Sequence, residues 1–282
     1  MLNRAPRADT HLHLSRWWPD LAHTGYRADL DYSVDGLLRE MDTVDIDFGL
    51  AIQIIETPDA KAGYDESRSL FEASHGRLKP VFTVDPTKGE ASVQATLDLW
   101  AHVKGTAGIK IFPGYRPFYP HDPRLEPVYE YAHRHRLPVL IHQGDTLHRN
   151  GLVKFARPIE VDEVAVRYPD VRFVLCHFGN PWIDEAAELL YKNENLYADT
   201  SGLLAHPSVP YFERAVEQCR SRITAAIVAI GSADRVLYGS DWPLEELKVA
   251  VGLVDGLELT LADRDKILGG NARRLFGAPE SD

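Results

Sequence analysis

The sequence predicts an α/β protein built as a single (β/α)8 TIM barrel, and three observations support this fold class. Eight short apolar runs alternate with longer helical patterns along the 282 residues. Several runs, such as PVLIH and RFVLCH, are almost continuously apolar, which is typical of parallel strands buried on both faces. The chain length is also close to the roughly 250 residues of an average barrel of this type. No linker-like stretch divides the chain, so we expect one domain over residues 1–282.

Each expected strand is followed by a helical pattern. The expected strands are residues 8–13, 48–54, 80–84, 108–112, 138–142, 171–177, 196–199 and 236–238. The expected helices are residues 33–41, 65–74, 91–103, 127–135, 158–168, 181–191 and 209–230, with a closing helical segment at 261–277. Asn180-Pro181 predicts a capped helix start, and Asp241-Trp242-Pro243, followed by two glutamates, predicts another. The alternative fold is an open doubly wound sheet, which would need a glycine-rich phosphate turn that the sequence lacks.

The composition narrows the class of partner. The hydrophobic content is 44% and the charged content 26%, as in ordinary globular proteins. A net charge of -11 without a basic cluster argues against nucleic acid or an anionic membrane surface as a partner. Only two cysteines, Cys176 and Cys219, are present, so no disulfide framework is expected. Without a signal-like apolar segment or a spanning run, we expect a cytoplasmic protein that acts on a small molecule.

Histidines and one aspartate stand at the ends of four expected strands. Alternate residues of a strand point to one side, so the DTHLH stretch would aim two imidazoles at one place. The carboxyl ends of all strands in a barrel meet at one mouth, which would gather the whole set. Nitrogen and oxygen ligands with an open water position suit a borderline ion such as Zn²⁺, whereas a hydrogen-bonded polar plug would leave several imidazoles without partners. The residues are His11, His13, His142, His177 and Asp241.

The other eight histidines are expected at the surface, with His148 as the one candidate near the mouth.

The chain also resembles a known family through seven stretches: DTHLH, GIKIFPG, LPVLIHQGD, FVLCHFGNPW, LYADTSG, VLYGSDWP and ILGGNARRLFG. Between Asp9 and Phe276 these resemble the amidohydrolase-2 group of the amidohydrolase superfamily. That group contains lactone and amide hydrolases as well as decarboxylases such as aminocarboxymuconate semialdehyde decarboxylase.

The resemblance implies one divalent metal ion at the mouth of the barrel. Zn²⁺ is the expected ion, with Mn²⁺ or Fe²⁺ as alternatives. His177 is expected beside the metal-bound water. The implied metal ligands are His11, His13, His142 and Asp241.

Lys110 leaves two interpretations open. It lies between Ile109 and Ile111 on the fourth strand and therefore points to the side opposite both. It could be a cation that pairs with Asp145, Asp199 or a substrate carboxylate. Alternatively, KIFPG is similar to the lysine segment of dihydroorotase and phosphotriesterase, which implies a carbamylated lysine bridging two metals. His142 and His177 would then bind the second ion, although the amidohydrolase-2 group more often has a single metal.

Aromatic and basic residues follow several strand ends. The aromatic residues could wall a cavity for a flat substrate, or they could cap the barrel or bury a homodimer contact. The arginines are candidates for binding a substrate carboxylate. The aromatic set is Trp17, Trp18, Tyr115, Phe118, Tyr119, Trp182 and Trp242, and the basic set is Arg16, Arg116 and Arg149.

Three functional hypotheses follow from these observations. The leading one is a metal-dependent hydrolase of a C–O or C–N bond in a small lactone, ester or amide. Metal-bound water is acidic enough to supply hydroxide near pH 7, Asp241 would move its proton, and His177 would polarise the substrate. The alternative is a non-oxidative decarboxylase of a small unsaturated or aromatic acid at the same metal site. A metal-dependent binding protein is the third hypothesis, and it would not need the spare acid–base groups.

Overall fold

The computed structural model describes residues 6–18, 30–101, 103, 105–204, 208 and 210–277. Its eight strands pair in parallel, and their order in the sheet is their order in the sequence. The strands β1 to β8 span Arg7–Leu12, Ile46–Ile52, Leu78–Thr83, Gly108–Ile111, Val139–Ile141, Phe173–Leu175, Leu196–Asp199 and Val236–Leu237. Backbone hydrogen bonds join Thr10 to Tyr238 at 2.9 Å and His13 to Trp242 at 2.7 Å. These bonds connect the first and last strands, so the predicted barrel is confirmed.

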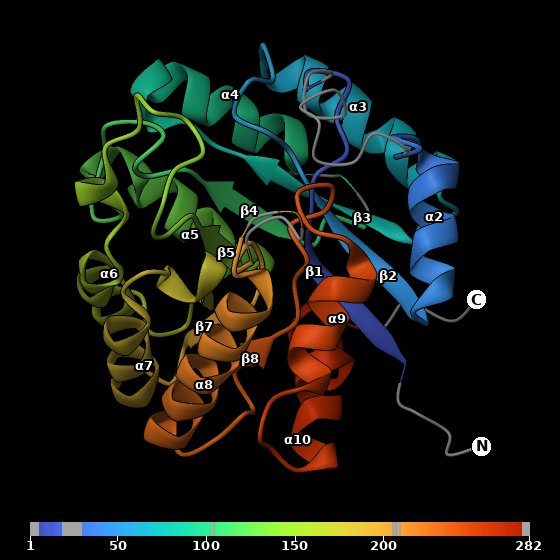
Figure 1. Cartoon of the computed structure of the whole chain (residues 1–282). Helices are drawn as coiled ribbons and strands as arrows, with labels where there is room; N and C mark the ends of the chain where they lie inside the picture. Colours follow the sequence, from blue (N-terminus) through green and yellow to red (C-terminus); the bar gives the residue numbers. More distant parts are fainter. Residues whose placement is uncertain are drawn as a thin grey trace.

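Helices surround the strands on the outside of the barrel (Figure 1). The helices α2 to α11 span Val34–Thr43, Ala60–Ala73, Glu90–Trp100, Glu126–His135, Asp162–Arg167, Ile183–Lys192, Phe212–Ile230, Leu247–Asp255, Leu261–Asp265 and Asn271–Phe276. Side-chain caps begin three of them: Ser33 accepts a hydrogen bond from Gly36 N, Asp59 accepts one from Ala62 N, and Thr260 accepts one from Asp263 N. Within the described ranges, no helix has both the length and the apolar character needed to cross a membrane.

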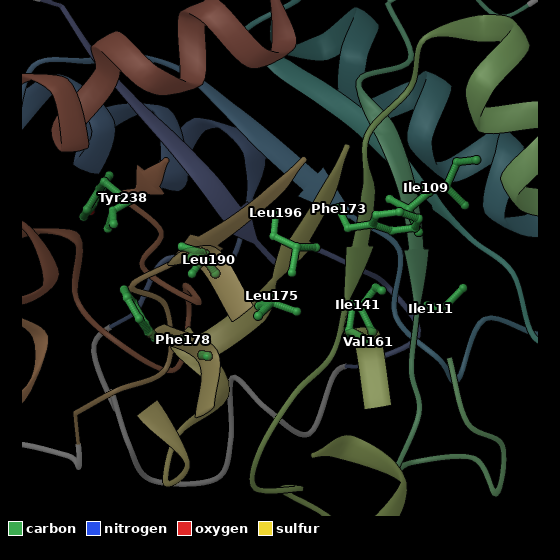
Figure 2. Packing of buried hydrophobic residues seen from close by; sticks show 14 of the residues in the cluster. Ile109, Ile111, Ile141, Val161, Phe173, Leu175, Phe178, Leu190, Leu196 and Tyr238 are labelled. Carbon is green, nitrogen blue, oxygen red and sulfur yellow. The ribbon is translucent and has the colours of Figure 1, made fainter. Parts of the chain in front are cut away.

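The buried apolar residues form two layers on either side of the strands. In the outer layer, residues such as Ile109, Ile141 and Leu175 pack against the helices, as Figure 2 shows. The inner layer contains their sequence neighbours Leu140 and Cys176, which point the other way because successive strand residues alternate. The strands are therefore covered on both faces, as the continuous apolar runs predicted.

Two predicted boundaries are wrong near the functional site. Asn180-Pro181 does not begin a helix: α7 starts at Ile183, because Asn180 N donates to His177 O and Asn180 O accepts from Asp145 N. The sixth strand ends at Leu175 rather than at His177, because His177 has a φ of 59°.

Helix boundaries elsewhere also differ from the sequence patterns. The window 158–168 divides into a 3-10 turn, Pro158–Val161, followed by α6. The helix predicted to start at Asp241-Trp242-Pro243 is α9. It begins only at Leu247, with Glu246 as its cap residue. The closing segment is helical as predicted, and a π-helical turn, Lys266–Gly270, separates α10 from α11.

Candidate metal centre and active site

His11 and His13 lie on either side of Leu12, the last residue of β1, and each directs its Nε2 atom toward Asp241. The Nδ1 atom of His11 lies 3.0 Å from Asp199 Oδ2, and Nδ1 of His13 lies 3.2 Å from the carbonyl oxygen of Ile52. A ring nitrogen that faces a carboxylate or a carbonyl acts as the donor, so both rings carry a proton on Nδ1. Their Nε2 lone pairs then point into the site, 3.5 Å and 3.3 Å from Asp241 Oδ1.

Asp241 and His177 are held by an unusual backbone conformation. Their φ angles are 62° and 59°, in the left-handed region that side chains with a Cβ usually avoid. Asp241 N donates to His11 O at 2.8 Å, and His177 N donates to Asp199 Oδ1 at 2.9 Å, which keeps both residues in place. Strained residues of this kind often occur where a functional side chain must have one direction.

Gly202 lets these two side chains approach the loop after β7. Its φ is 60°, and a Cβ at this position would lie 2.8 Å from Asp241 Oδ2 and 2.9 Å from His177 Nδ1. Any other residue would therefore collide with both functional side chains. The close approach explains a glycine at this place.

His142 and His177 face each other across the mouth of the barrel. His142 Nε2 lies 2.9 Å from Asp145 O, and His177 Nδ1 lies 3.0 Å from Ser201 O, so these two nitrogens are donors. The remaining atoms, His142 Nδ1 and His177 Nε2, are 3.2 Å apart and both present lone pairs. Two lone pairs aimed at each other need a shared proton or a cation, which makes this pair a second cation-attracting point beside Asp241.

Burial and charge keep these side chains in the protonation states that metal ligands require. Burial, assisted by the charge of Lys110, lowers the pKa of His11 to about 3. Burial also lowers the pKa of His142 well below its usual value. For Asp241, burial would raise the pKa, but the neighbouring His13 and His11 side chains outweigh it and hold the pKa far below the usual range. The site therefore offers the neutral imidazoles of His11 and His142 and the ionised carboxylate of Asp241.

The residues present fit a divalent metal ion. The ligand atoms of His11, His13 and Asp241 all lie within 4.8 Å of one another, and all three residues are buried. His11 Nε2 has no hydrogen-bond partner in the described part of the chain, although it is completely buried. A cation between these atoms would satisfy that nitrogen. His142, the fourth ligand implied by the resemblance, lies outside this group of three and next to His177, so the complete ligand set stays a prediction.

Lys110 has a partner that the sequence analysis did not consider. Its Nζ atom lies 2.8 Å from Cys176 Sγ, and the residue is completely buried. The expected pairing with Asp145 or Asp199 is wrong, because Asp145 is exposed and the Asp199 carboxylate binds His11 and the loop after β7. Lys110 points into the barrel interior, opposite Ile109 and Ile111, as the strand alternation predicted.

A cavity opens at the carboxyl ends of the strands around this cluster. A second hollow, of about 140 Å³, adjoins this cavity. Tyr115, His142, His177 and Asp241 line both of them. Besides the candidate ligands, the walls of the cavity are Trp18, Ile54, Ile55, Phe112, Tyr115 and Leu244, with Glu56 and His148 as polar neighbours. Mostly apolar walls with a few convergent polar groups are typical of small-molecule sites.

Two residues predicted to contact substrate, Trp18 and Tyr115, line this cavity, and so does His148. The Trp18 ring lies edge-on to His13, with 5.9 Å between centroids. The Tyr115 hydroxyl accepts a hydrogen bond from Leu147 N at 2.9 Å, and its ring lies 4.7 Å from that of His142. His148, the one histidine expected near the mouth, lines the cavity and lies 3.5 Å from Glu56.

The remaining predicted arginines and aromatics do not line this cavity. Arg116 pairs with Asp85 at 3.1 Å, and Arg16 Nε lies 3.4 Å from Glu66. Trp242 is completely buried, and its ring stacks on Tyr32 with 5.4 Å between centroids. The structure thus favours packing over substrate contact for Trp242. Trp17, Phe118, Tyr119, Arg149 and Trp182 also lie outside the cavity lining.

Sequence reasoning missed the role of the last residue of β7, Asp199, and of Ser201 just after the strand. Asp199 was considered only as a partner for Lys110, yet it binds His11 and the backbone of His177. The Ser201 hydroxyl lies 2.9 Å from His11 Nδ1 and 3.0 Å from His177 Nδ1. The position of Asp199 at the carboxyl end of a barrel strand was the available signal.

Eight parallel strands around a buried cluster of histidines and carboxylates make this chain a barrel with a candidate metal centre. The chain belongs to the amidohydrolase family, because the Amidohydro_2 family model matches residues 8–278. The resemblance found in the sequence is therefore confirmed.

The named relatives by sequence are gamma-resorcylate decarboxylases. The protein of Polaromonas sp. (strain JS666 / ATCC BAA-500) is 30% identical over 130 residues, which cover 39% of this chain and 35% of that protein. The protein of Rhizobium sp. (strain MTP-10005) is 26% identical over 193 residues, covering 58% of this chain and 54% of that one. These matches thus span between a third and just over half of the relatives' length.

Solved structures share the fold along nearly the whole chain. An amidohydrolase from Burkholderia multivorans with bound zinc has a TM-score of 0.73 and 20% identity, covering 98% of this chain and 100% of that one. A dihydroxybenzoic acid decarboxylase from Polaromonas sp. JS666 with bound manganese and 2-nitroresorcinol has a TM-score of 0.68 and 17% identity, covering 98% and 97%. A putative 2-pyrone-4,6-dicarboxylic acid hydrolase from Pseudomonas putida has a TM-score of 0.66 and 19% identity, covering 97% and 98%.

Proposed function

We propose that this protein is a metal-dependent, non-oxidative decarboxylase of a small aromatic carboxylic acid, with a dihydroxybenzoate as the first candidate. This was the alternative hypothesis from the sequence, and the named sequence relatives favour it over the hydrolase. The structural observation that supports it is the buried group of His11, His13 and Asp241 at a cavity with aromatic walls. Such walls can hold a flat ring against the metal ligands.

The chain's own side chains can hold the substrate and move the proton that this reaction needs. A divalent ion bound by His11, His13 and Asp241 would supply positive charge that orients a carboxylate or phenolate oxygen. Phe112 and Tyr115 would contact the ring and exclude water from it. When the bond to the carboxyl carbon breaks, carbon dioxide leaves, the ring carbon keeps the electron pair, and that carbon takes up one proton.

The proton comes from water, and Asp241 and His177 are the groups placed to accept it and pass it to the ring carbon. Both approach Gly202 from the cavity side, so they are close neighbours at the wall nearest the ligand group. His177 is held by Ser201 through Nδ1, which leaves its Nε2 atom to face the cavity wall and His142. We further propose a single ion per chain, Zn²⁺ or Mn²⁺, since three suitable ligands form one compact group.

The deciding experiment measures the products of the metal-loaded enzyme in D₂O. With 2,6-dihydroxybenzoate and its isomers, we expect carbon dioxide release and one deuterium on the aromatic product at the former carboxyl position. The variant His13→Asn should lose this activity, while His133→Asn on the exposed face of α5 is the matched control and should keep it. Hydrolysis of lactones or esters with ¹⁸O from water, without carbon dioxide from any acid of the panel, would refute the decarboxylase and favour the hydrolase.

A further inference from the structure

Lys110 carries a charge in the barrel interior just beneath the candidate metal centre. It is completely buried in the middle of β4, and Leu140 is its register partner on β5. Its Nζ atom lies 2.8 Å from Cys176 Sγ and 5.0 Å from the centroid of the Phe112 ring. Phe112 lines the cavity, so the lysine lies directly behind the cavity wall.

The contacts of Cys176 connect this lysine to the metal ligands. Cys176 Sγ forms a group with His11 and Asp199 in which all ligand atoms lie within 4.8 Å of one another. The Cys176 sulfur therefore lies 2.8 Å from the ammonium and within 4.8 Å of a ring nitrogen of His11. In the described part of the chain, no carboxylate lies within 4 Å of Lys110 Nζ to form an ion pair. The positive charge is therefore not cancelled locally, and in a poorly polarisable interior its effect extends to the neighbouring side chains.

We propose that Lys110 is a positioning residue that sets the ligand preference of the cavity, favouring a bound monoanion and weakening metal binding. Asp241 among the ligands and the Asp199 carboxylate behind His11 carry two negative charges, which balance a divalent ion, so Lys110 leaves the loaded centre with an excess positive charge. A carboxylate ligand neutralises that excess, whereas a neutral ester, lactone or amide does not. The same charge repels a divalent cation. The proposal rests on the proposed function only in naming a carboxylate as the anion.

This role predicts two effects of opposite sign, which a purely structural role would not produce. Lys110→Met keeps an unbranched side chain, shorter by one heavy atom, and removes its charge. We expect the variant to bind Zn²⁺ more tightly and benzoate more weakly, each on the order of tenfold for one charge at this separation. Binding of benzamide, which has nearly the same shape without the charge, should stay unchanged. A residue that only fills space would weaken both Zn²⁺ and benzoate binding when replaced.

The experiment measures binding by calorimetry, so it needs no turnover. Zn²⁺ is titrated into metal-free protein against a competing chelator, and benzoate and benzamide are then titrated into the Zn²⁺-loaded protein. Cys176→Ala keeps the ammonium and should retain the preference for benzoate. Leu140→Met, a change of similar size on the paired strand, is the matched control and should alter neither affinity. If Lys110→Met does not fold by circular dichroism, Lys110→Gln replaces it with the same expected signs.

Several results would overturn the proposal. In Lys110→Met these are a loss of both Zn²⁺ and benzoate affinity, unchanged affinities, or the loss of one metal equivalent. In the wild type it is a failure to prefer benzoate over benzamide. The loss of a metal equivalent would indicate a carbamylated lysine that bridges two ions. If no acid is decarboxylated but the two opposite shifts are found, the proposed function fails and the role of Lys110 stands. If an acid is decarboxylated but the two opposite shifts are not found, the proposed function stands and the role of Lys110 fails.

Discussion

Asp199 Oδ2 lies 3.0 Å from His11 Nδ1 although 188 positions separate the two residues, and both side chains are completely buried. The carboxylate fixes the tautomer of the ring, so His11 presents Nε2 to Asp241. We expect Asp199→Asn to weaken Zn²⁺ binding by about 10- to 100-fold, the usual effect of removing such a partner. Competition with a chelator measures this affinity. The exposed Asp98→Asn on α4 is the control, and equal affinity in both variants would contradict the role of Asp199.

Metal removal should abolish activity reversibly. His11, His13 and Asp241 supply deprotonated ligands, and a chelator competes with them for the ion. We expect activity to return on addition of Zn²⁺ or another first-row divalent ion. The double variant with His11→Ala and His13→Ala should bind no metal and regain no activity. Full activity in a preparation shown by elemental analysis to be metal-free would contradict the metal-dependent mechanism.

His177 distinguishes one bound metal from two. If a single ion is bound, His177→Asn should keep nearly one equivalent of metal and lose about 10²–10⁴ in kcat, as expected for a positioned acid–base group. If two ions are bound, the variant should lose about one equivalent. Elemental analysis and steady-state kinetics on the same sample make the distinction. We expect the first result. Two equivalents in the wild type, together with a carbamate on Lys110, would show the second arrangement.

The sequence predicts the strands and the strand-end residues well because both depend on local patterns. Short apolar runs located all eight strands, and the barrel geometry then brought His11 and Asp241 together although 230 positions separate them in the printed sequence. Helix starts near the site were less predictable. Asn180-Pro181 has the composition of a helix start, but tertiary hydrogen bonds to His177 and Asp145 occupy that backbone.

Side-chain partners were the least predictable part of the site. Proximity in sequence to Asp241 suggested that Trp242 contacts substrate, whereas its ring is completely buried and stacks on Tyr32. The partner of Lys110 depends on which strand residues share a layer of the barrel interior. Cys176 shares that layer, but a single cysteine has no sequence pattern that would identify it as the partner.

Trp242 and Trp18 should therefore behave differently when truncated. Trp242 is completely buried, so Trp242→Ala should lower the free energy of unfolding by about 3–5 kcal/mol, the range for large aromatic core residues. Trp18 lines the cavity beside His13, so Trp18→Ala should raise KM with a smaller effect on stability. Urea unfolding and substrate kinetics test the pair. A raised KM without loss of stability in Trp242→Ala would restore the substrate-contact hypothesis.

Glu245 should make stability fall as the pH rises. Its carboxyl group is buried and accepts a hydrogen bond from Leu204 N at 2.6 Å. Burial raises the pKa of Glu245 well above the ordinary value of 4.5. The folded protein therefore keeps a proton that the unfolded chain loses above that value. This contribution to stability is complete below pH 4.5 and is lost as the pH rises toward the folded-state pKa.

Glu245→Gln cannot ionise and should remove this pH dependence. We expect the free energy of unfolding of the variant, relative to wild type, to increase between pH 5 and pH 8. The slope is at most about 1.4 kcal/mol per pH unit, the value for one proton. Urea unfolding of metal-free protein at four pH values measures it. The exposed Glu188→Gln on α7 is the control and should follow the wild type at every pH. A constant difference between Glu245→Gln and wild type over this range would show that Glu245 is already ionised in the folded protein.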